Sequence, residues 1–265
     1  MTCPTCCCAG VCPTHAGSRL KPRELTICGL TAVKARFQHN AASILRLYFD
    51  RETGRKLGAM CKALAAARKV YRCVEVAELA KIAGSVHHGG VIAVVLAPAL
   101  SAPSETELRS WAAKRLPVLI LDRIGNAHNL GALARTAAFF GVPHLVIADD
   151  PAAARPNDAA YRVAEGGLES MTTWMVRDLP SFVRQMAAAG YDVVGAATRG
   201  GRPEAGRVGA KPVALVMGNE EHGLAPDLTK ACTRLVTIPG AGAVESLNVS
   251  VAGAVLMWEL IGRRG

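Results

Sequence analysis

A regular alternation of apolar strand patterns and helical patterns fills the second half of this chain, and it constrains the fold more than any other feature. Strands are predicted at 117–122, 144–148, 173–176, 192–197, 213–217 and 234–238, and helices at about 130–140, 158–164, 179–189, 226–231 and 247–261. Strands that alternate with helices form a largely parallel sheet covered on both faces. This half of the chain is therefore expected to be an α/β domain.

Three of the predicted strands end in polar residues and glycines. These stretches are 119–142, 215–224 and 235–265. The first carries Arg135 on its helix, the second carries Glu220 between glycines, and the third reaches Ser246, which is placed to cap the final helix. Open α/β sheets bind ligands beyond the carboxyl ends of their strands, so we expect one site there. The absence of GxGxxG and GxxxxGK patterns argues against NAD and ATP chemistry.

The first half predicts a smaller α/β unit. Its elements are expected as a helix at 29–37, a strand at 44–49, a helix at 55–68, a strand at 70–74, a helix at 76–83 and a strand at 91–96. The first 23 residues lack periodic apolar spacing, which is typical of a flexible tail. The predicted organisation is a tail at 1–23, a small domain at 24–98, a linker at 99–115 with a short helix, and a larger domain at 116–265.

The net charge of +10 lies entirely in the first half of the chain. Residues 1–115 contain 17 Lys and Arg against 7 Asp and Glu, whereas residues 116–265 contain 14 of each. Positive charge concentrated on one domain indicates a polyanionic partner, most plausibly nucleic acid, because neutralising phosphates releases condensed counterions. A solvated basic face without a partner is the alternative.

Cysteines crowd the amino terminus. Cys3 and Cys6 have the spacing of a zinc knuckle, and Cys12 with His15 would complete four ligands. The loop between these pairs is very short, and adjacent cysteines are not a standard ligand pattern, which favours a disordered or redox-sensitive tail. Both interpretations stay open, and no metal is assigned.

No targeting or membrane segment is recognisable. The chain has no run of about eighteen uncharged apolar residues, which a transmembrane helix requires. Its amino terminus lacks the charged and apolar pattern of a secretory signal. A cytoplasmic location, with no membrane partner, is therefore expected.

The polar stretches together resemble the SpoU/TrmH family of RNA 2′-O-ribose methyltransferases, in the SPOUT superfamily. The matching residues are Asn129-Leu130-Gly131 through Arg135 to Gly141, then Gly218-Asn219-Glu220 with Gly223-Leu224, then Ile238-Pro239 with Ser246 to Ala252. The resemblance covers the chain from about residue 24, since the segment from Ile27 to Val91 is similar to the small ribosomal-protein-like RNA-binding domain of some members. It agrees with the separately observed division of charge.

The resemblance implies a knotted (trefoil) α/β methyltransferase domain, S-adenosylmethionine as cofactor and a homodimer whose active site takes residues from both subunits. It also implies ribosomal or transfer RNA as substrate, with ribosomal RNA favoured. By position in the motifs, the cofactor-binding residues would be Thr198, Gly200, Met217, Gly218, Ile238 and Leu247. No metal is required, because the sulfonium supplies its own leaving group.

The catalytic residues implied by the resemblance are Arg135, Asn129, Glu220, Ser246 and Asn248. Arg135 matches the catalytic arginine; its permanent charge favours electrostatic stabilisation and phosphate positioning over action as a base. Asn129 is expected either to cap the helix that bears Arg135 or to contact substrate. Glu220 is expected to orient Arg135 or a cofactor group. Ser246 and Asn248 would contact substrate and cofactor.

One departure from the family pattern is Glu221, which stands where many members have a small residue and is expected to face solvent. Two rival functions remain. One is a non-catalytic RNA-binding protein that kept the methyltransferase fold, and the intact motif residues argue against it. The other is a metal-dependent nucleic-acid-binding protein led by the cysteine tail.

Overall fold

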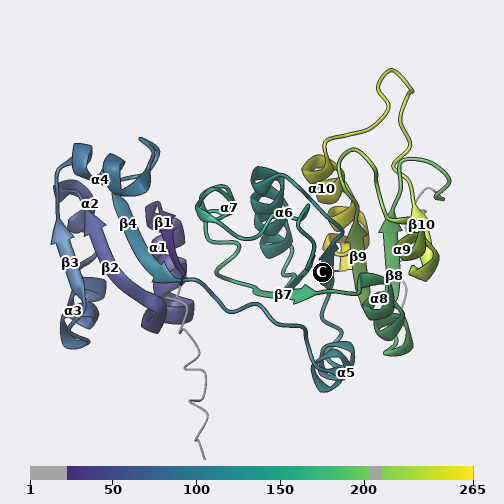
Figure 1. Ribbon diagram of the computed structural model, residues 1–265, viewed down its shortest axis with the longest axis horizontal. Coiled ribbons are helices and arrows are strands. Elements are labelled where there is room, and N and C mark those ends of the chain that lie inside the picture. Colours follow the sequence, from purple (N-terminus) through teal and green to yellow (C-terminus); the bar gives the residue numbers. More distant parts are fainter. Residues whose placement is uncertain (1–22, 203–210, 265) are drawn as a thin grey trace, which may run out of the picture.

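The computed structural model describes residues 23–202 and 211–264, and these form two sheets (Figure 1). The cysteine cluster and His15 lie outside the described residues. Within the described ranges, no helix combines the length and the apolar character needed to cross a membrane. The α/β fold class is confirmed, and the larger sheet is parallel throughout.

The first sheet has the strand order β1-β4-β2-β3. Strand β4 pairs antiparallel with β1 and β2, and β3 adds to β2 in parallel at the edge. All five residues from Val91 to Val95 are buried, as expected for a central strand. The elements are β1 (Glu24–Cys28), α1 (Leu30–Asn40), the 3₁₀ turn η1 (Ala41–Ser43), β2 (Ile44–Phe49), α2 (Arg51–Gly54), α3 (Gly58–Ala66), β3 (Val70–Cys73), α4 (Val76–Ala83) and β4 (Val91–Leu96).

The second sheet has six parallel strands in the order β10-β8-β9-β5-β6-β7. Leu119 and Leu121 of β5 pack with helices α6, α7 and α10, whereas Val118 and Ile120 pack with α5, α8 and α9, so both faces are covered. The elements are α5 (Glu105–Ala113), β5 (Val118–Leu121), α6 (Ala127–Phe139), β6 (His144–Ala148), α7 (Asp158–Ala164), β7 (Thr172–Val176), α8 (Leu179–Ala188), β8 (Asp192–Ala196), β9 (Val213–Met217), α9 (Pro226–Ala231), β10 (Arg234–Val236), α10 (Val249–Leu260) and η2 (Gly262–Arg264).

Both predicted helix caps were wrong. Helix α6 begins one turn earlier than expected, and Asn126, rather than Asn129, accepts a hydrogen bond from the His128 amide at 2.8 Å. Helix α10 is capped by Asn248, which accepts from the amide of Ser250 at 2.9 Å, and not by Ser246. In each case the chain offers several capping residues close together, and the path of the preceding loop selects among them.

Two further differences lie in the leading domain. Strand β1 was not predicted, because five residues following an irregular segment give too short a pattern. The helix predicted at 55–68 corresponds to α3, which is shorter at both ends, and the short helix α2 before it was not predicted. The short helix expected in the linker is α5, and its Leu108 and Trp111 are buried against the larger sheet.

Helix α7 lies between the two sheets (Figure 1) and joins the leading domain to the larger one. Asp158 at its start accepts a hydrogen bond from the Thr26 amide of β1 at 3.1 Å. The guanidinium of Arg36, on α1, lies over the ring of Tyr161 at 5.3 Å. Arg36 is buried, as is Glu169 beyond the end of α7, so the contact between the domains encloses ionisable groups.

Replacing Glu169 with Gln is expected to stabilise the fold above neutral pH. Burial raises the pKa of Glu169 to about 7, although the nearby Arg36 acts in the opposite direction. The folded state therefore binds the proton more tightly than the unfolded state, whose pKa is near 4.5. The contribution of this proton to the free energy of unfolding is complete below pH 4.5. It is lost as the pH rises through 7, and the loss is on the order of 2–3 kcal/mol.

Urea unfolding at pH 5 and pH 8 tests this expectation. The difference in unfolding free energy between the two pH values should be smaller in Glu169→Gln than in the unchanged protein, and the variant should be the more stable at pH 8. Glu105→Gln, at an exposed position on α5, serves as the control. An identical pH dependence in the unchanged protein and Glu169→Gln would show that the buried carboxyl is not the cause.

Candidate active site

A cavity of about 670 Å³ opens beyond the carboxyl ends of β8, β9 and β10. Three segments far apart in sequence line it, at 196–199, 217–224 and 245–249. The chain runs from β5 to β6 and β7 on one side of the sheet and then returns to β8 on the other side. Ligands of open α/β sheets bind at such a reversal, and the volume suits a ligand of several hundred daltons.

A chain of side-chain hydrogen bonds links the three motif stretches. Asn248 Nδ2 donates to Asn129 Oδ1 at 3.3 Å, and Asn129 Nδ2 donates to Glu220 Oε1 at 2.8 Å. Asn129 and Glu220 are more than ninety residues apart in the sequence. Motifs that are distant in the chain therefore meet at one edge of the sheet. This confirms the expectation that the strand ends converge.

Glu220 is held as a carboxylate by its donors. Burial raises its pKa, but this is outweighed by the hydrogen bond from the Asn129 side chain and by backbone hydrogen bonds, so the pKa lies below the ordinary value. One backbone donor is the amide of Gly125, at 3.2 Å from Oε2. Glu220 forms no ion pair with Arg135 among the described residues of this chain, where Arg135 pairs with Glu165, and it stays a prediction that Glu220 orients Arg135 or a cofactor group. It ties the β5–α6 loop to the β9–α9 loop.

The turn that follows β9 requires a glycine at its first position. The amides and carbonyls of Asn219 and Gly223 pair at 2.9 and 3.0 Å, which folds the turn back on itself. A Cβ on Gly218 would overlap backbone atoms of Gly223 and Leu224. Asn219 Oδ1 accepts hydrogen bonds from the amides of Glu221 and His222 at 3.0 Å, so the side chain of Asn219 stabilises the turn.

Glu221 projects away from this turn. Its side chain is 85% exposed, and its Oε2 lies 3.9 Å from Nε2 of His222, which is exposed as well. The expectation that Glu221 faces solvent is therefore confirmed.

Five of the six residues expected at the cofactor line this cavity. They are Thr198, Met217, Gly218, Ile238 and Leu247. Gly200, the sixth, does not line it, although its φ of +75° marks a turn beside the cavity that glycine adopts readily. Ser246 and Asn248 lie on the cavity wall as well. The assignment of these residues to a cofactor stays a prediction.

Arg135 lies apart from the cavity of its own chain. It stands on α6 six residues beyond Asn129, and its Nη2 is 3.0 Å from Oε2 of Glu165. Neither side chain is buried. Sequence reasoning did not identify Glu165, because nothing in the spacing shows that the turn after α7 reaches the second turn of α6.

Several other residues shape the site without having been predicted. Asn219 Nδ2 donates to the carbonyl of Arg123 at 2.8 Å, and the buried Asp122 accepts from the Ala225 amide at 2.9 Å. Arg199 and Glu245, both on the cavity wall, form an exposed ion pair at 2.9 Å. An asparagine directly after a glycine is a turn signal, so Asn219 was open to prediction, whereas the long-range partners were not.

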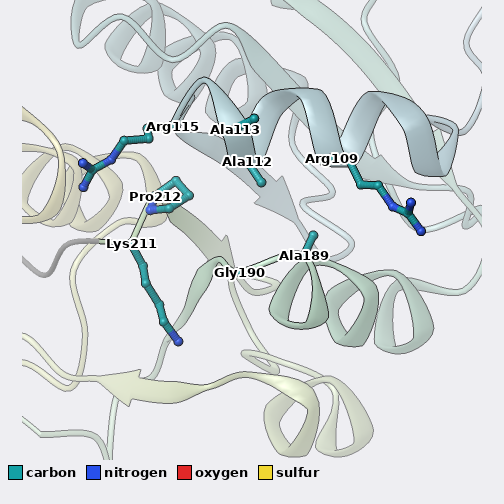
Figure 2. Close-up of a pocket in the computed structure, with 8 residues that line it drawn as sticks. All are labelled: Arg109, Ala112, Ala113, Arg115, Ala189, Gly190, Lys211 and Pro212. Carbon is teal, nitrogen blue, oxygen red and sulfur yellow. The ribbon is translucent and has the colours of Figure 1, made fainter.

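A second, more open hollow of about 580 Å³ lies between the end of α5, the end of α8 and the start of β9. Its floor is made of alanines, Gly190 and Pro212. Figure 2 shows the charged ends of Arg109, Arg115 and Lys211 pointing in different directions. Charges that diverge do not build one anion site, and none of the described residues that line this hollow carries a carboxylate or a hydroxyl.

Two family models match the chain. The SpoU rRNA Methylase family matches residues 117–258, which include all the motif residues from Asn129 to Ala252. A second model, described as RNA 2′-O ribose methyltransferase substrate binding, matches residues 26–100. The two matches together extend over both sheets.

Individual proteins agree with these matches. The 23S rRNA (guanosine-2′-O-)-methyltransferase RlmB of Ralstonia nicotianae is 35% identical over 240 residues, with 90% of this chain and 95% of that protein covered. An uncharacterized tRNA/rRNA methyltransferase, YfiF, of Escherichia coli O157:H7 is 34% identical over 245 residues, covering 91% of this chain and 69% of that protein.

A solved structure shares the fold. The AdoMet-bound rRNA methyltransferase from Sinorhizobium meliloti has a TM-score of 0.73 at 24% identity, with 91% of this chain and 87% of that chain covered. The convergent motifs, the family models and this likeness agree, and the chain belongs to the SpoU rRNA Methylase family.

Proposed function

We propose that this protein transfers a methyl group from S-adenosylmethionine to a ribose 2′-hydroxyl of ribosomal RNA. The observation that carries this proposal is the hydrogen-bonded convergence of Asn129, Glu220 and Asn248 beside the cavity at the strand ends. Residues that the resemblance assigns to the active site therefore lie together, in a chain that belongs to that family.

The cavity fits S-adenosylmethionine. Its polar rim and its apolar wall, which includes Leu224, Val249 and Leu256, suit a ligand with both a polar and an aromatic part. Gly218 lines the cavity and packs so closely against Gly223 and Leu224, which also line it, that a Cβ there would displace this turn. When bound, the cofactor supplies an electrophilic methyl on a sulfonium. We assign its binding to Thr198, Met217, Gly218, Ile238 and Leu247, which all line the cavity.

Methyl transfer requires the protein to stabilise the alkoxide that develops as the 2′-hydroxyl loses its proton. We assign this role to Arg135, whose guanidinium stays charged and offers several donors. Ser246 and Asn248, on the cavity wall, are assigned to the substrate and cofactor contacts, with Asn129 and Glu220 holding Asn248 in place.

A homodimer would bring Arg135 to a cavity. Arg135 does not line the cavity of its own chain, so its proposed role requires the cavity of a second copy. An apolar surface on α6 and α10 supports such pairing: Phe139 is 83% exposed, and Val251, Val255 and Trp258 are exposed as well. Apolar residues that gather on one exposed face mark association sites. Homodimer formation is thus part of the proposal.

The leading domain supplies the RNA contact in this proposal. Exposed cations lie on α2, α3 and β3 and in the turns after the two helices: Arg51, Arg55, Lys56, Lys62, Arg68 and Arg72. Tyr71 is exposed on the same edge strand. Arginine and aromatic side chains together suit RNA, because they contact phosphates and stack on unpaired bases.

Three finer expectations belong to the proposal. The domain limits at 24–98 and 116–265, with a linker between them, agree with the two sheets of the fold. The knotted path of the chain stays a prediction. A cytoplasmic location places the enzyme with ribosomal RNA, and ribosomal RNA is favoured over transfer RNA by names such as RlmB among the relatives.

Transfer of labelled methyl to RNA tests the function. Unmodified total RNA is incubated with the protein and labelled S-adenosylmethionine, and the RNA is then separated by size. Label in the large ribosomal RNA bands is expected. Label in transfer RNA alone would correct the substrate, and no label in any band despite measurable cofactor binding would favour the non-catalytic RNA-binding alternative.

A further inference from the structure

The turn between α7 and β7, residues 165–169, touches both the leading domain and the helix that bears Arg135. We refer to these five residues as the connector. Its first residue, Glu165, ends α7, and its last, Glu169, is buried near the start of β7. Figure 1 shows α7 between α1 and α6, so the connector leaves α7 from a position beside both helices.

Glu165 forms an ion pair with Arg135 from an unfavourable backbone conformation. Its Oε2 lies 3.0 Å from Nη2 of Arg135. Its φ and ψ of 45° and 44° are left-handed, which a residue other than glycine adopts at a cost of about 1–2 kcal/mol. Two glycines follow, and a glycine at this helix end would relieve the strain. Glycine is favoured at this position, so the presence of Glu165 indicates that its carboxylate has a role.

The two glycines fix the connector between the domains. A Cβ on Gly166, whose φ is +98°, would lie 3.2 Å from Cβ of Ala35 on α1. A Cβ on Gly167 would lie 2.9 Å from Cα of Arg135. The backbone of the connector is thus packed directly against α1 on one side and against α6 on the other. Little space remains for it to shift unless α1 or α6 moves with it.

The far end of the connector faces the same helix of the leading domain. Glu169 is buried and lies within electrostatic range of Arg36, the residue that follows Ala35 on α1. Arg36 also stacks over Tyr161 of α7. The leading domain therefore packs against the connector at Gly166 and influences Glu169 electrostatically through Arg36, while Glu165 pairs with Arg135.

We propose that Glu165 is a positioning residue for Arg135, and that the connector makes this position depend on the seating of the leading domain against α7. The carboxylate fixes the direction of the guanidinium on α6, and the packing of Gly166 against Ala35 fixes the carboxylate. RNA bound by the leading domain would in this way be held in a fixed position relative to Arg135, the arginine that acts on it. This inference rests on the proposed function, in which Arg135 acts on the reacting hydroxyl.

Glu165→Gln tests the proposal, with Glu105→Gln as the matched control. Both glutamates are exposed partners of an arginine, and Glu105 lies on α5 with Arg109. Glu165→Gln is expected to lower kcat for methyl transfer by about tenfold, because small losses of orientation are costly, while KM for S-adenosylmethionine stays unchanged. Glu165→Asp should recover part of kcat, and Glu105→Gln should change neither constant.

A double-variant cycle separates positioning from a general structural effect. If Glu165 acts through Arg135, Glu165→Gln should reduce kcat much less in an Arg135→Lys protein than in the unchanged one. A second readout uses no RNA: the Nε–Hε NMR signal of Arg135 should shift in Glu165→Gln but not in Glu105→Gln.

The failures of the two proposals are distinguishable. Full kcat in Glu165→Gln, together with loss of activity in Arg135→Ala, would overturn the positioning role and leave the proposed function intact. An increased kcat in Glu165→Gln would also overturn it, since the carboxylate would then restrain the arginine. Full activity in Arg135→Ala would instead refute the assigned role of Arg135 itself.

Discussion

Replacing Arg135 with Ala is expected to reduce methyl transfer by about a hundred- to a thousandfold, as the loss of a charge stabiliser in a transition state generally does. Binding of S-adenosylmethionine should remain, because Arg135 is assigned to the reacting hydroxyl and the residues assigned to the cofactor are others, which line the cavity. The fold should remain as well, since the side chain is exposed and its ion pair with Glu165 is at the surface. Single-turnover methyl transfer and calorimetric cofactor binding measure the two effects separately.

Arg135→Lys is the informative companion variant. It keeps a positive charge but loses the planar donor group, so it should retain a small part of the activity if charge alone contributes. An unchanged rate in Arg135→Ala would contradict the assigned role. Equal losses of activity and cofactor binding would show that Arg135 contributes to binding of the cofactor and not to stabilisation of the reacting hydroxyl.

Replacing Gly218 with Ala is expected to weaken cofactor binding by at least about tenfold. The added Cβ would overlap backbone atoms of Gly223 and Leu224, so the turn after β9 must move away from its position. Overpacking of this kind typically costs about 1–3 kcal/mol, and here the shift falls on the cavity wall. Calorimetric titration with S-adenosylmethionine measures the affinity.

Gly240→Ala is the matched control for this variant. Gly240 lies in the loop before Ser246, and a Cβ there would meet nothing within 4 Å. Its affinity for the cofactor is expected to stay within about twofold of the unchanged protein, since surface substitutions of this kind have small effects. Equal affinities in Gly218→Ala and Gly240→Ala would show that the turn of Gly218 does not form the cofactor site.

Mixing the two inactive variants tests whether the active site is shared between subunits. A mixed dimer of Arg135→Ala and Gly218→Ala has one site with an intact cavity and an intact partner arginine. If subunits exchange at random, about a quarter of the unchanged activity should return. No recovery after confirmed subunit exchange would place Arg135 and the cavity within one chain.

The sequence was most informative about the larger domain. Strands β6 and β9 and helices α7 and α9 have the predicted limits, because their apolar patterns are bounded by Pro, Gly or Asn residues that end a segment clearly. The convergence of the motifs was also predicted, since carboxyl ends of parallel strands share one edge of the sheet.

The partners of individual side chains were not predictable in the same way. Asn126 and Asn129 are equally good caps in sequence, and only the loop path from β5 selects Asn126. The apolar composition of α10 predicted a helix but not which of its residues are buried, and Val251, Val255 and Trp258 are exposed. Glu165 pairs with Arg135 through a contact between two helices that no local pattern encodes.

The chemical position of the transferred methyl tests the central claim most directly. RNA methylated by the protein with labelled S-adenosylmethionine is hydrolysed in alkali, in which cleavage requires a free 2′-hydroxyl. A ribose 2′-O-methyl blocks cleavage at its own nucleotide, so the account predicts label in alkali-resistant dinucleotides from ribosomal RNA. Label found in mononucleotides would place the methyl on a base and would contradict the account.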